Sequence, residues 1–516
     1  MSDGAGSSDG QSGRSDQSIV EYVSQRRDSA DVSRRSVLRT LGAGGLGGLA
    51  GCLRLSQQQG TETSSDGGTA DPSATPPRTP ADTPTDAPEN TPQETEPEDG
   101  TDTDGTSGDP VRIGLIQPLS GSLEPYGQIA TRGFYTYFGY RGADIPGEIT
   151  AGVETFDVGG TTYEIDVRDS AADAGQAQAQ AEMLVESANA TVLAGGTSAA
   201  AAQAIADTVA GPAEVPYMAG PASSVGLTAR NCSPTVFRAS ETAAMGAQAG
   251  ANFIELDPTS TSVYIYHADY TYGETIRDTY SRLLEESGLT VAGTRALPQG
   301  YSSDWFGEFQ EAADANVDIV IGGFSIATIP SMLEAFLAGD YDFRFMTNWG
   351  TQLFADVLGT VVSSALGDVS ADSLEEAGLG PFPTRYHWNQ YDNPIATEAN
   401  EIHRSAYGTN TDMFTSGMFT GASAIVQAVE QSGSTNRADI VDELTGMTVE
   451  ETLKGPDAYT FQEYNNQARS PMTIADPVPT EDTEYWDAAI QPDAPNTTYN
   501  PDQTARDPSL VDCNLN

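Results

Sequence analysis

The chain has 516 residues, which is enough for two or three domains. Its 74 acidic residues far outnumber its 24 basic residues, giving a formal net charge of −50 at pH 7. Such a surface repels nucleic acid and anionic lipid, so neither is an expected partner. Lys454 is the only lysine in the sequence. An acidic, lysine-poor composition is typical of proteins from extreme halophiles, in which molar salt screens the self-repulsion.

Residues 1–52 have the pattern of an export signal. Arg34 and Arg35 precede an apolar, glycine-rich stretch over 38–50, which is shorter than the roughly 20 apolar residues of a membrane span. This pattern predicts twin-arginine export. The tetrapeptide that ends at Cys52 resembles a lipobox, which predicts a lipid anchor on this cysteine at the outer face of the cell membrane. A chance arginine pair and an unrelated cysteine are the alternative.

Residues 53–109 consist almost entirely of Thr, Asp, Pro, Glu, Ser and Gly. This composition cannot build a core, and its acidic residues repel one another, so we expect a disordered, extended tether. It would hold a folded body away from the membrane.

From Val111 the chain alternates short apolar runs with helical patterns. Expected strands and helices follow one another through 111–116, 127–140, 163–167, 176–188, 192–196, 199–210 and 215–218. A second alternating set begins after Ser240, and the pattern weakens between about 357 and 395. Alternation of this kind predicts βαβ units, and therefore an α/β fold with parallel sheets in two similar halves.

Small and hydroxyl residues follow two neighbouring predicted strands. Thr197 and Ser198 follow one strand, and Ala222-Ser223-Ser224 follow the next. Carboxyl ends of parallel strands meet at one sheet edge, where open α/β sheets bind ligands. Ser198 also opens a helix, whose N-terminus favours a carboxylate or another electron-rich group. The simpler alternative is that Thr197 and Ser198 only cap the helix.

Several motifs together resemble the branched-chain amino acid, urea and amide receptors of ABC importers. They include the opening Ile113–Gly121 with Tyr126-Gly127, Asp169, Val215-Pro216, Pro221–Ser224, Leu227-Thr228, Val236–Arg238, Tyr272-Gly273, Gly322–Phe324 and Gly455. The resemblance covers about residues 111–475. It implies a type I periplasmic binding protein fold, with two Rossmann-like lobes joined by three crossovers that form a hinge. The implied lobes are 111–238 with 392–455, and 239–391 with 456–516 including the C-terminal tail.

The same resemblance implies a ligand site. Ser198 and Ser224 match positions whose hydroxyls bind the ligand carboxylate, and Ala222 matches one that binds through its backbone. Tyr272 matches an aromatic residue that closes over the ligand, and Phe324 stands where the family often has tyrosine. Trp349 stands where amino-acid receptors carry the carboxylate that pairs with the ligand ammonium. We therefore expect an amide, a urea-like compound or a carboxylate with an apolar body ahead of a zwitterionic amino acid.

Catalysis would need an activated nucleophile, an acid–base pair or a metal site. The three histidines, His267, His387 and His403, are scattered and show no metal-ligand spacing. We expect no enzyme, no cofactor and no metal, but a monomeric receptor that delivers a small ligand to ABC permease and ATPase subunits. A sensory receptor that serves a signalling partner is the alternative, and an extracellular enzyme is a more distant one.

With Cys52 assigned to the anchor, Cys232 and Cys513 remain as an even pair in an oxidising compartment. A bridge between them would tie the loop-rich tail to the body, although the sequence leaves open whether it forms. Glycosylation at Asn189, Asn231 or Asn496 is also left open.

Overall fold

The structure is a computed structural model that describes residues 108–481, 483–505 and 508–515. The expected export signal, Cys52 and almost all of the expected tether lie outside the described residues. No helix in the described part of the chain is long and apolar enough to cross a membrane.

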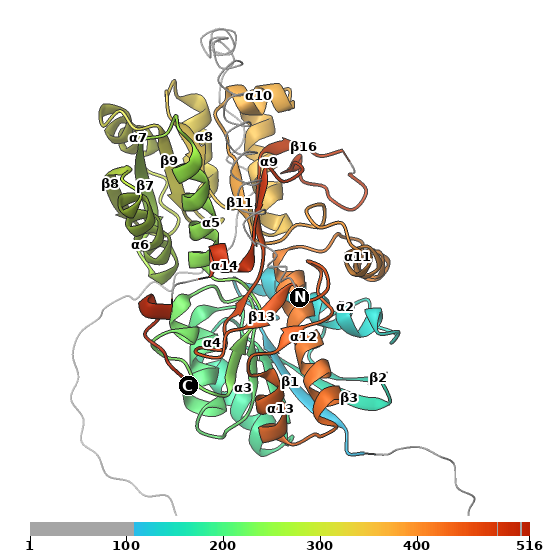
Figure 1. The fold of residues 1–516 in the computed structure, drawn as a ribbon. Helices are drawn as coiled ribbons and strands as arrows, with labels where there is room; N and C mark the ends of the chain where they lie inside the picture. The colour runs from blue at the N-terminus through green and yellow to red at the C-terminus, as the bar shows by residue number, and fades with distance from the viewer. Residues whose placement is uncertain (1–107, 482, 506–507, 516) are drawn as a thin grey trace, which may run out of the picture. The chain divides into compact units, whose positions relative to one another are not determined.

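The first lobe is built on a six-stranded sheet in the order β2-β3-β1-β4-β5-β6 (Figure 1). Its strands are β1 (Val111–Gln117), β2 (Gly152–Val158), β3 (Thr161–Asp169), β4 (Val192–Gly195), β5 (Tyr217–Ala219) and β6 (Val236–Arg238). All neighbours are parallel except the β2–β3 pair. The central strands are almost continuously apolar and buried, as expected when helices cover both faces of a parallel sheet.

The helices of this lobe come from two distant parts of the chain. They are α2 (Glu124–Tyr140), α3 (Ala174–Glu186), α4 (Ala199–Ile205), the π-helical turn η2 (Ala206–Ala210), the 3₁₀ turn η3 (Val225–Thr228), α11 (Pro394–Tyr407), α12 (Met413–Ser432) and α13 (Arg437–Leu444). Helix α12 is buried along most of its length and packs against α2. The two backbones approach closely because position 133 is glycine: a Cβ there would lie 2.5 Å from Thr415 Cα.

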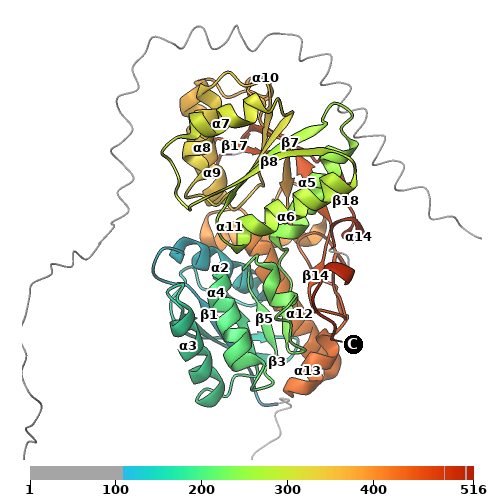
Figure 2. The ribbon, with the colours of Figure 1, turned by 90° about the vertical axis from the view of Figure 1, so that its left-hand side faces the viewer.

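The second lobe has a four-stranded parallel sheet in the order β10-β9-β7-β8. Figure 2 shows its helices packed around this sheet. The elements are α5 (Ala243–Leu256), β7 (Ser262–Ala268), α6 (Thr271–Glu286), β8 (Thr290–Leu297), α7 (Trp305–Asp314), β9 (Ile319–Gly323), α8 (Ile329–Ala338), β10 (Arg344–Met346), α9 (Gln352–Leu366) and α10 (Ala371–Glu376).

The remaining strands lie in three small antiparallel sheets, in the orders β11-β15-β18, β12-β13-β14 and β16-β17. They are β11 (Phe382–Thr384), β12 (Thr448–Val449), β13 (Tyr459–Phe461), β14 (Ala468–Arg469), β15 (Met472–Ala475), β16 (Pro477–Pro479), β17 (Ile490–Pro492) and β18 (Thr497–Tyr499), with the short helices α14 (Pro501–Thr504) and η4 (Pro508–Leu510) nearby.

The prediction of an α/β fold with parallel sheets in two lobes is confirmed. The sequence assigned residues 456–516 to the second lobe, but in the structure this segment contributes to both cores. Tyr459 and Phe461 belong to the first-lobe core, because β13 pairs with β12 just after the first-lobe helix α13. Trp486 and Ile490 belong to the second-lobe core. The lobe boundaries themselves stay a prediction.

Cys232 and Cys513 form a disulfide in the structure, with their Cα atoms 6.0 Å apart and a sequence separation of 281. Closing so long a loop restricts the unfolded chain. We expect the Cys232→Ser/Cys513→Ser double variant to lose about 2–5 kcal/mol of unfolding free energy. Denaturant unfolding of oxidised wild type, reduced wild type and the double variant measures this. Equal stability of all three would contradict the prediction.

Candidate functional site

Three parallel strands of the first lobe end side by side, and this places the predicted hydroxyl residues at one edge. Gln117 ends β1, which pairs with β4, and β4 pairs in turn with β5. Thr197 follows β4 and donates a hydrogen bond from Oγ1 to Gln117 Oε1 over 2.6 Å. Ser198 caps α4, because its Oγ accepts from the amide of Ala201 over 3.4 Å. Both the capping role and the edge position predicted for Ser198 are therefore present.

The loop that follows β5 is held by its main chain. Arg238 Nη1 donates to the carbonyl oxygens of Ala222 and Ser224, over 2.9 and 2.5 Å. The carbonyl of Ser223 accepts from the amide of Ala243, which begins α5 in the second lobe, over 3.0 Å. The Ser224 side chain accepts from the amide of Gly226. Neither Ser198 nor Ser224 donates its hydroxyl proton to another described residue, so both hydroxyls can donate to a ligand oxygen.

Arg238 holds this loop in place and is fully buried. Besides the two carbonyls, it donates to Gln467 Oε1 from Nε over 2.6 Å and to Thr228 Oγ1 from Nη2 over 2.5 Å. All of these partners are neutral. Burial, together with the nearby positive charge of Arg385, lowers the pKa of Arg238 to about 9.

Aromatic residues from the two lobes come together near this edge. Tyr272, in the first turn of α6, packs against Tyr270 with ring centroids 6.2 Å apart. Tyr126, from α2 of the first lobe, interacts electrostatically with Asp412 and Tyr272, and its hydroxyl is hydrogen-bonded to Thr351. Burial, with a further contribution from Asp412, raises the pKa of Tyr126 to about 12. Tyr272 therefore lies where the lobes meet.

The other two predicted aromatic contacts lie in the core of the second lobe. Phe324 and Trp349 are each only 2 % exposed. Phe324 packs edge-on against Trp305, and Trp349 packs against Phe382 and donates its indole N–H to the carbonyl of Ala475 over 3.4 Å. Because their rings are covered by protein, we do not include them among the proposed ligand contacts.

Two buried polar residues that the sequence did not single out face the beginning of α5. Arg385 is 5 % exposed, and its Nε has no hydrogen-bond partner. Asn348 follows β10, is 9 % exposed, and its Oδ1 is also without a partner. A Cβ built on Gly246 would lie 3.2 Å from Asn348 Oδ1 and 3.8 Å from Arg385 Nε, so the two groups converge on one point of α5. The nearest residue that the sequence singled out is His387, two positions after Arg385.

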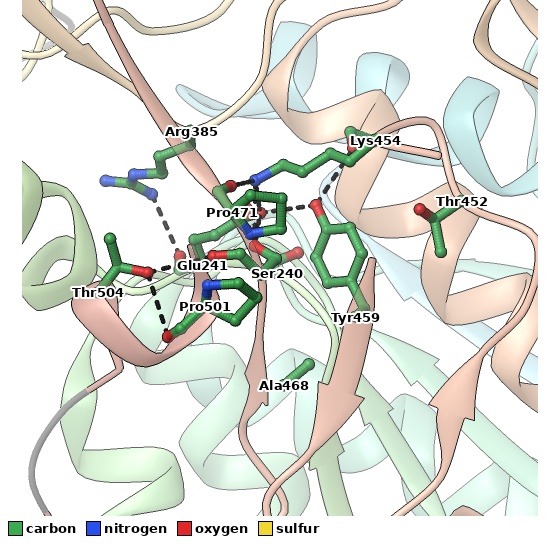
Figure 3. Close-up of polar contacts among 12 residues, drawn as sticks. Ser240, Glu241, Arg385, Thr452, Lys454, Tyr459, Ala468, Pro471, Pro501 and Thr504 are labelled. Atoms are coloured by element: carbon green, nitrogen blue, oxygen red, sulfur yellow. Dashed lines mark hydrogen bonds and ion pairs between the residues drawn. The ribbon is translucent and has the colours of Figure 1, made fainter. Parts of the chain in front are cut away.

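Glu241 and Lys454 form a buried ion pair close to Arg385 (Figure 3). Glu241 Oε1 accepts from Lys454 Nζ and from the Tyr459 hydroxyl, each over 2.6 Å, and from Ser470 Oγ over 2.9 Å. Lys454 Nζ also donates to the carbonyl of Pro471 over 2.6 Å. Burial opposes ionisation of Glu241, yet these donors, Lys454 above all, hold its pKa below the usual value.

His387 and His403 are buried among other side chains of the protein. Burial lowers the pKa of His387 and of His403 to about 3, so both rings are neutral near pH 7. No group of three or more His, Cys, Asp or Glu side chains within the described residues could hold a metal ion. The edge instead offers the hydroxyl donors of Ser198 and Ser224, and the Arg385 guanidinium lies near the beginning of α5; both kinds of group can hold a ligand oxygen.

Residues 110–481 match the family described as periplasmic binding protein. Among solved structures, the chain is similar to an ABC-type branched-chain amino acid transporter protein from Rhodopseudomonas palustris, with 20 % identity, a TM-score of 0.62, and coverage of 76 % of this chain and 97 % of that one. A leucine-binding protein from Thermotoga maritima is 18 % identical, with a TM-score of 0.59 and coverage of 76 % and 99 %. A solute-binding protein from Rhodopseudomonas palustris in complex with 4-hydroxybenzoate is 17 % identical, with a TM-score of 0.62 and coverage of 78 % and 100 %. No curated protein matches the chain.

Proposed function

Since the chain belongs to the periplasmic binding protein family, we propose that it is the receptor of an ABC importer and captures a small polar organic ligand between its lobes. The observation that carries the proposal is the loop over 222–224. Arg238 of the first lobe holds its carbonyls, and its Ser223 carbonyl is bonded to the first amide of the second-lobe helix α5. A ligand held by this loop therefore contacts a junction between the lobes, and contacts to both lobes stabilise a closed state.

In this proposal the first lobe binds a ligand oxygen through the hydroxyls of Ser198 and Ser224. Thr197 positions Gln117 beside them, and the main chain of Ala222 and Ser223 shapes the same edge. Tyr272 covers the ligand from the second lobe. These donors suit a carboxylate or an amide oxygen.

The test begins with the full chain purified without added ligand. Native mass spectrometry identifies a co-purified small molecule, and calorimetry with that molecule gives its affinity. Small-angle scattering with and without the molecule reports closure of the lobes. We expect compaction on binding, and an affinity that Ser198→Ala with Ser224→Ala reduces at least tenfold, about 1.4 kcal/mol. Binding without compaction, or unaffected by both substitutions, contradicts the proposal.

We further propose that the receptor is exported by the twin-arginine route and anchored through a lipid on Cys52, beyond the described residues. Cys52→Ser is expected to release the protein from the membrane fraction and to alter its electrophoretic mobility. Fractionation of cells that express either form measures this. Unchanged membrane association would exclude the anchor while leaving the receptor function in place.

A further inference from the structure

Positive charge accumulates at the junction of the lobes, although the chain as a whole carries a formal charge of −50. Arg238, Arg385 and Lys454 are all buried there and act on one another electrostatically: Arg385 lies close enough to influence both of the others. Glu241 is the carboxylate of this group, and it is bonded to Lys454. Two buried guanidinium groups therefore lack a carboxylate partner within the described residues.

The two arginines differ in how their donors are used. Arg238 donates hydrogen bonds to four neutral acceptors. Arg385 donates from Nη1 to the carbonyl of Glu241 over 3.3 Å, and its buried Nε donates to nothing. Figure 3 shows Arg385 and Lys454 approaching Glu241 from different directions. A buried cation without an anion is costly, and an unsatisfied donor on it adds to that cost.

The surroundings of Arg385 are those of a ligand contact. Asn348 Oδ1 is also buried without a hydrogen-bond partner, and it faces the same glycine of α5, Gly246, as Arg385 Nε. Tyr272, the predicted covering residue, lies close enough to Arg385 for the cation to oppose the rise that burial causes in the tyrosine pKa. Gly246 lies one turn beyond Ala243, whose amide binds the Ser223 carbonyl. Arg385 thus lies close to Tyr272 and to the beginning of α5, which is bonded to the loop over 222–224.

We propose that Arg385 determines the specificity of this receptor, and that its ligand is an organic carboxylate with no compensating ammonium group. The inference rests on the receptor function proposed above and narrows it. The guanidinium supplies the charge that the neutral Ser198 and Ser224 hydroxyls do not, and a carboxylate offers the planar oxygen pair that a guanidinium binds well. Asn348 Oδ1 is an acceptor, so it suits a hydroxyl or another donor on the body of the same ligand. An ammonium group would meet only repulsion from Arg385.

The experiment compares acids with their uncharged and zwitterionic counterparts. Calorimetry of the full chain uses 4-hydroxybenzoate against 4-hydroxybenzamide, and 4-methylpentanoate against 4-methylpentanamide and leucine. We expect at least one acid to bind ten or more times tighter than its amide. Arg385→Gln should reduce that acid–amide ratio at least tenfold, and Arg385→Lys should restore part of it. Asn348→Asp, which places a carboxylate beside Arg385, should also reduce it.

Arg282→Gln is the matched control, because it removes the same charge from a half-buried arginine of α6 that pairs with Glu286. It should leave the ratio unchanged. A folded Arg385→Gln variant that keeps the wild-type ratio overturns the inference, and so does a wild-type chain that prefers an amide or leucine, or binds neither acid. The receptor function fails separately, if the co-purified molecule does not close the lobes.

Discussion

Replacing Lys454 by methionine should lower the free energy of unfolding by about 3–5 kcal/mol, because it leaves the carboxylate of Glu241 buried without its cation. Lys454 and Glu241 are almost completely buried and 2.6 Å apart. Tyr459 and Ser470 also donate to Glu241, but they are neutral and cannot replace the charge. The pair joins segments that lie 213 residues apart, so its loss should also loosen the junction between the lobes.

Denaturant unfolding followed by circular dichroism measures this effect. The Glu241→Leu/Lys454→Met double variant is the key comparison, since replacing both members of a buried pair by apolar groups is often close to neutral. Arg282→Met breaks an exposed pair with Glu286 and should cost at most about 1 kcal/mol. A Lys454→Met variant as stable as the Arg282→Met control would show that the ion pair contributes no net stability.

The same pair has a pH signature with a defined sign. Because the folded-state pKa of Glu241 lies below its unfolded value, its contribution is fully present above the unfolded pKa of about 4.3 and is lost as pH falls through the folded pKa. The difference in unfolding free energy between wild type and Glu241→Gln should therefore shrink below about pH 4.3. A difference that stays constant through acid titration would contradict this assignment.

The sequence predicts those strands whose signal lies within the strand itself, as a run of apolar residues. The apolar runs that became β4 and β9 are buried throughout, and in β1 every residue but Arg112 is buried, so their strand character follows from composition and length alone. The region 357–395 gave a weak pattern because it holds the end of α9, the short helix α10 and the three-residue strand β11, whose partner β15 lies about 90 residues further along the chain. A strand of that length carries no periodicity of its own.

The places of some candidate site residues in the fold could be predicted, because they too depend on a local pattern. Ser198 and Ser224 follow strand ends, and a strand end is a local feature. No local pattern marks Arg385, because the residue that it contacts, Glu241, lies 144 positions away in the sequence. The hypotheses for Phe324 and Trp349 came from the family resemblance, and a matching position in the chain does not fix where a side chain points. Both rings turn into the core of the second lobe.

The second large effect is expected at Arg238, where one side chain holds the whole loop over 222–224. Its Nη1 bonds two carbonyls of that loop, and its Nε and Nη2 tie it to Gln467 and Thr228. Arg238→Met would leave the carbonyls of Ala222 and Ser224 without this donor, which costs about 1–3 kcal/mol for each carbonyl that finds no new partner. Gln467 Oε1 would still accept from Thr228 Oγ1. The carbonyls would then turn away, and the Ser224 hydroxyl would move with them.

We therefore expect Arg238→Met to lose at least tenfold in affinity for the co-purified ligand, as well as stability. Arg238→Lys keeps the charge but not the planar fork of donors, so it should behave like methionine if the loop geometry matters. Calorimetry on variants shown to be folded by circular dichroism separates the two effects. Arg437→Met is the control, because Arg437 also bonds a main-chain carbonyl, that of Ala190, but on another loop. If Arg238→Lys retains wild-type affinity, charge near the site matters and the held geometry of the loop does not.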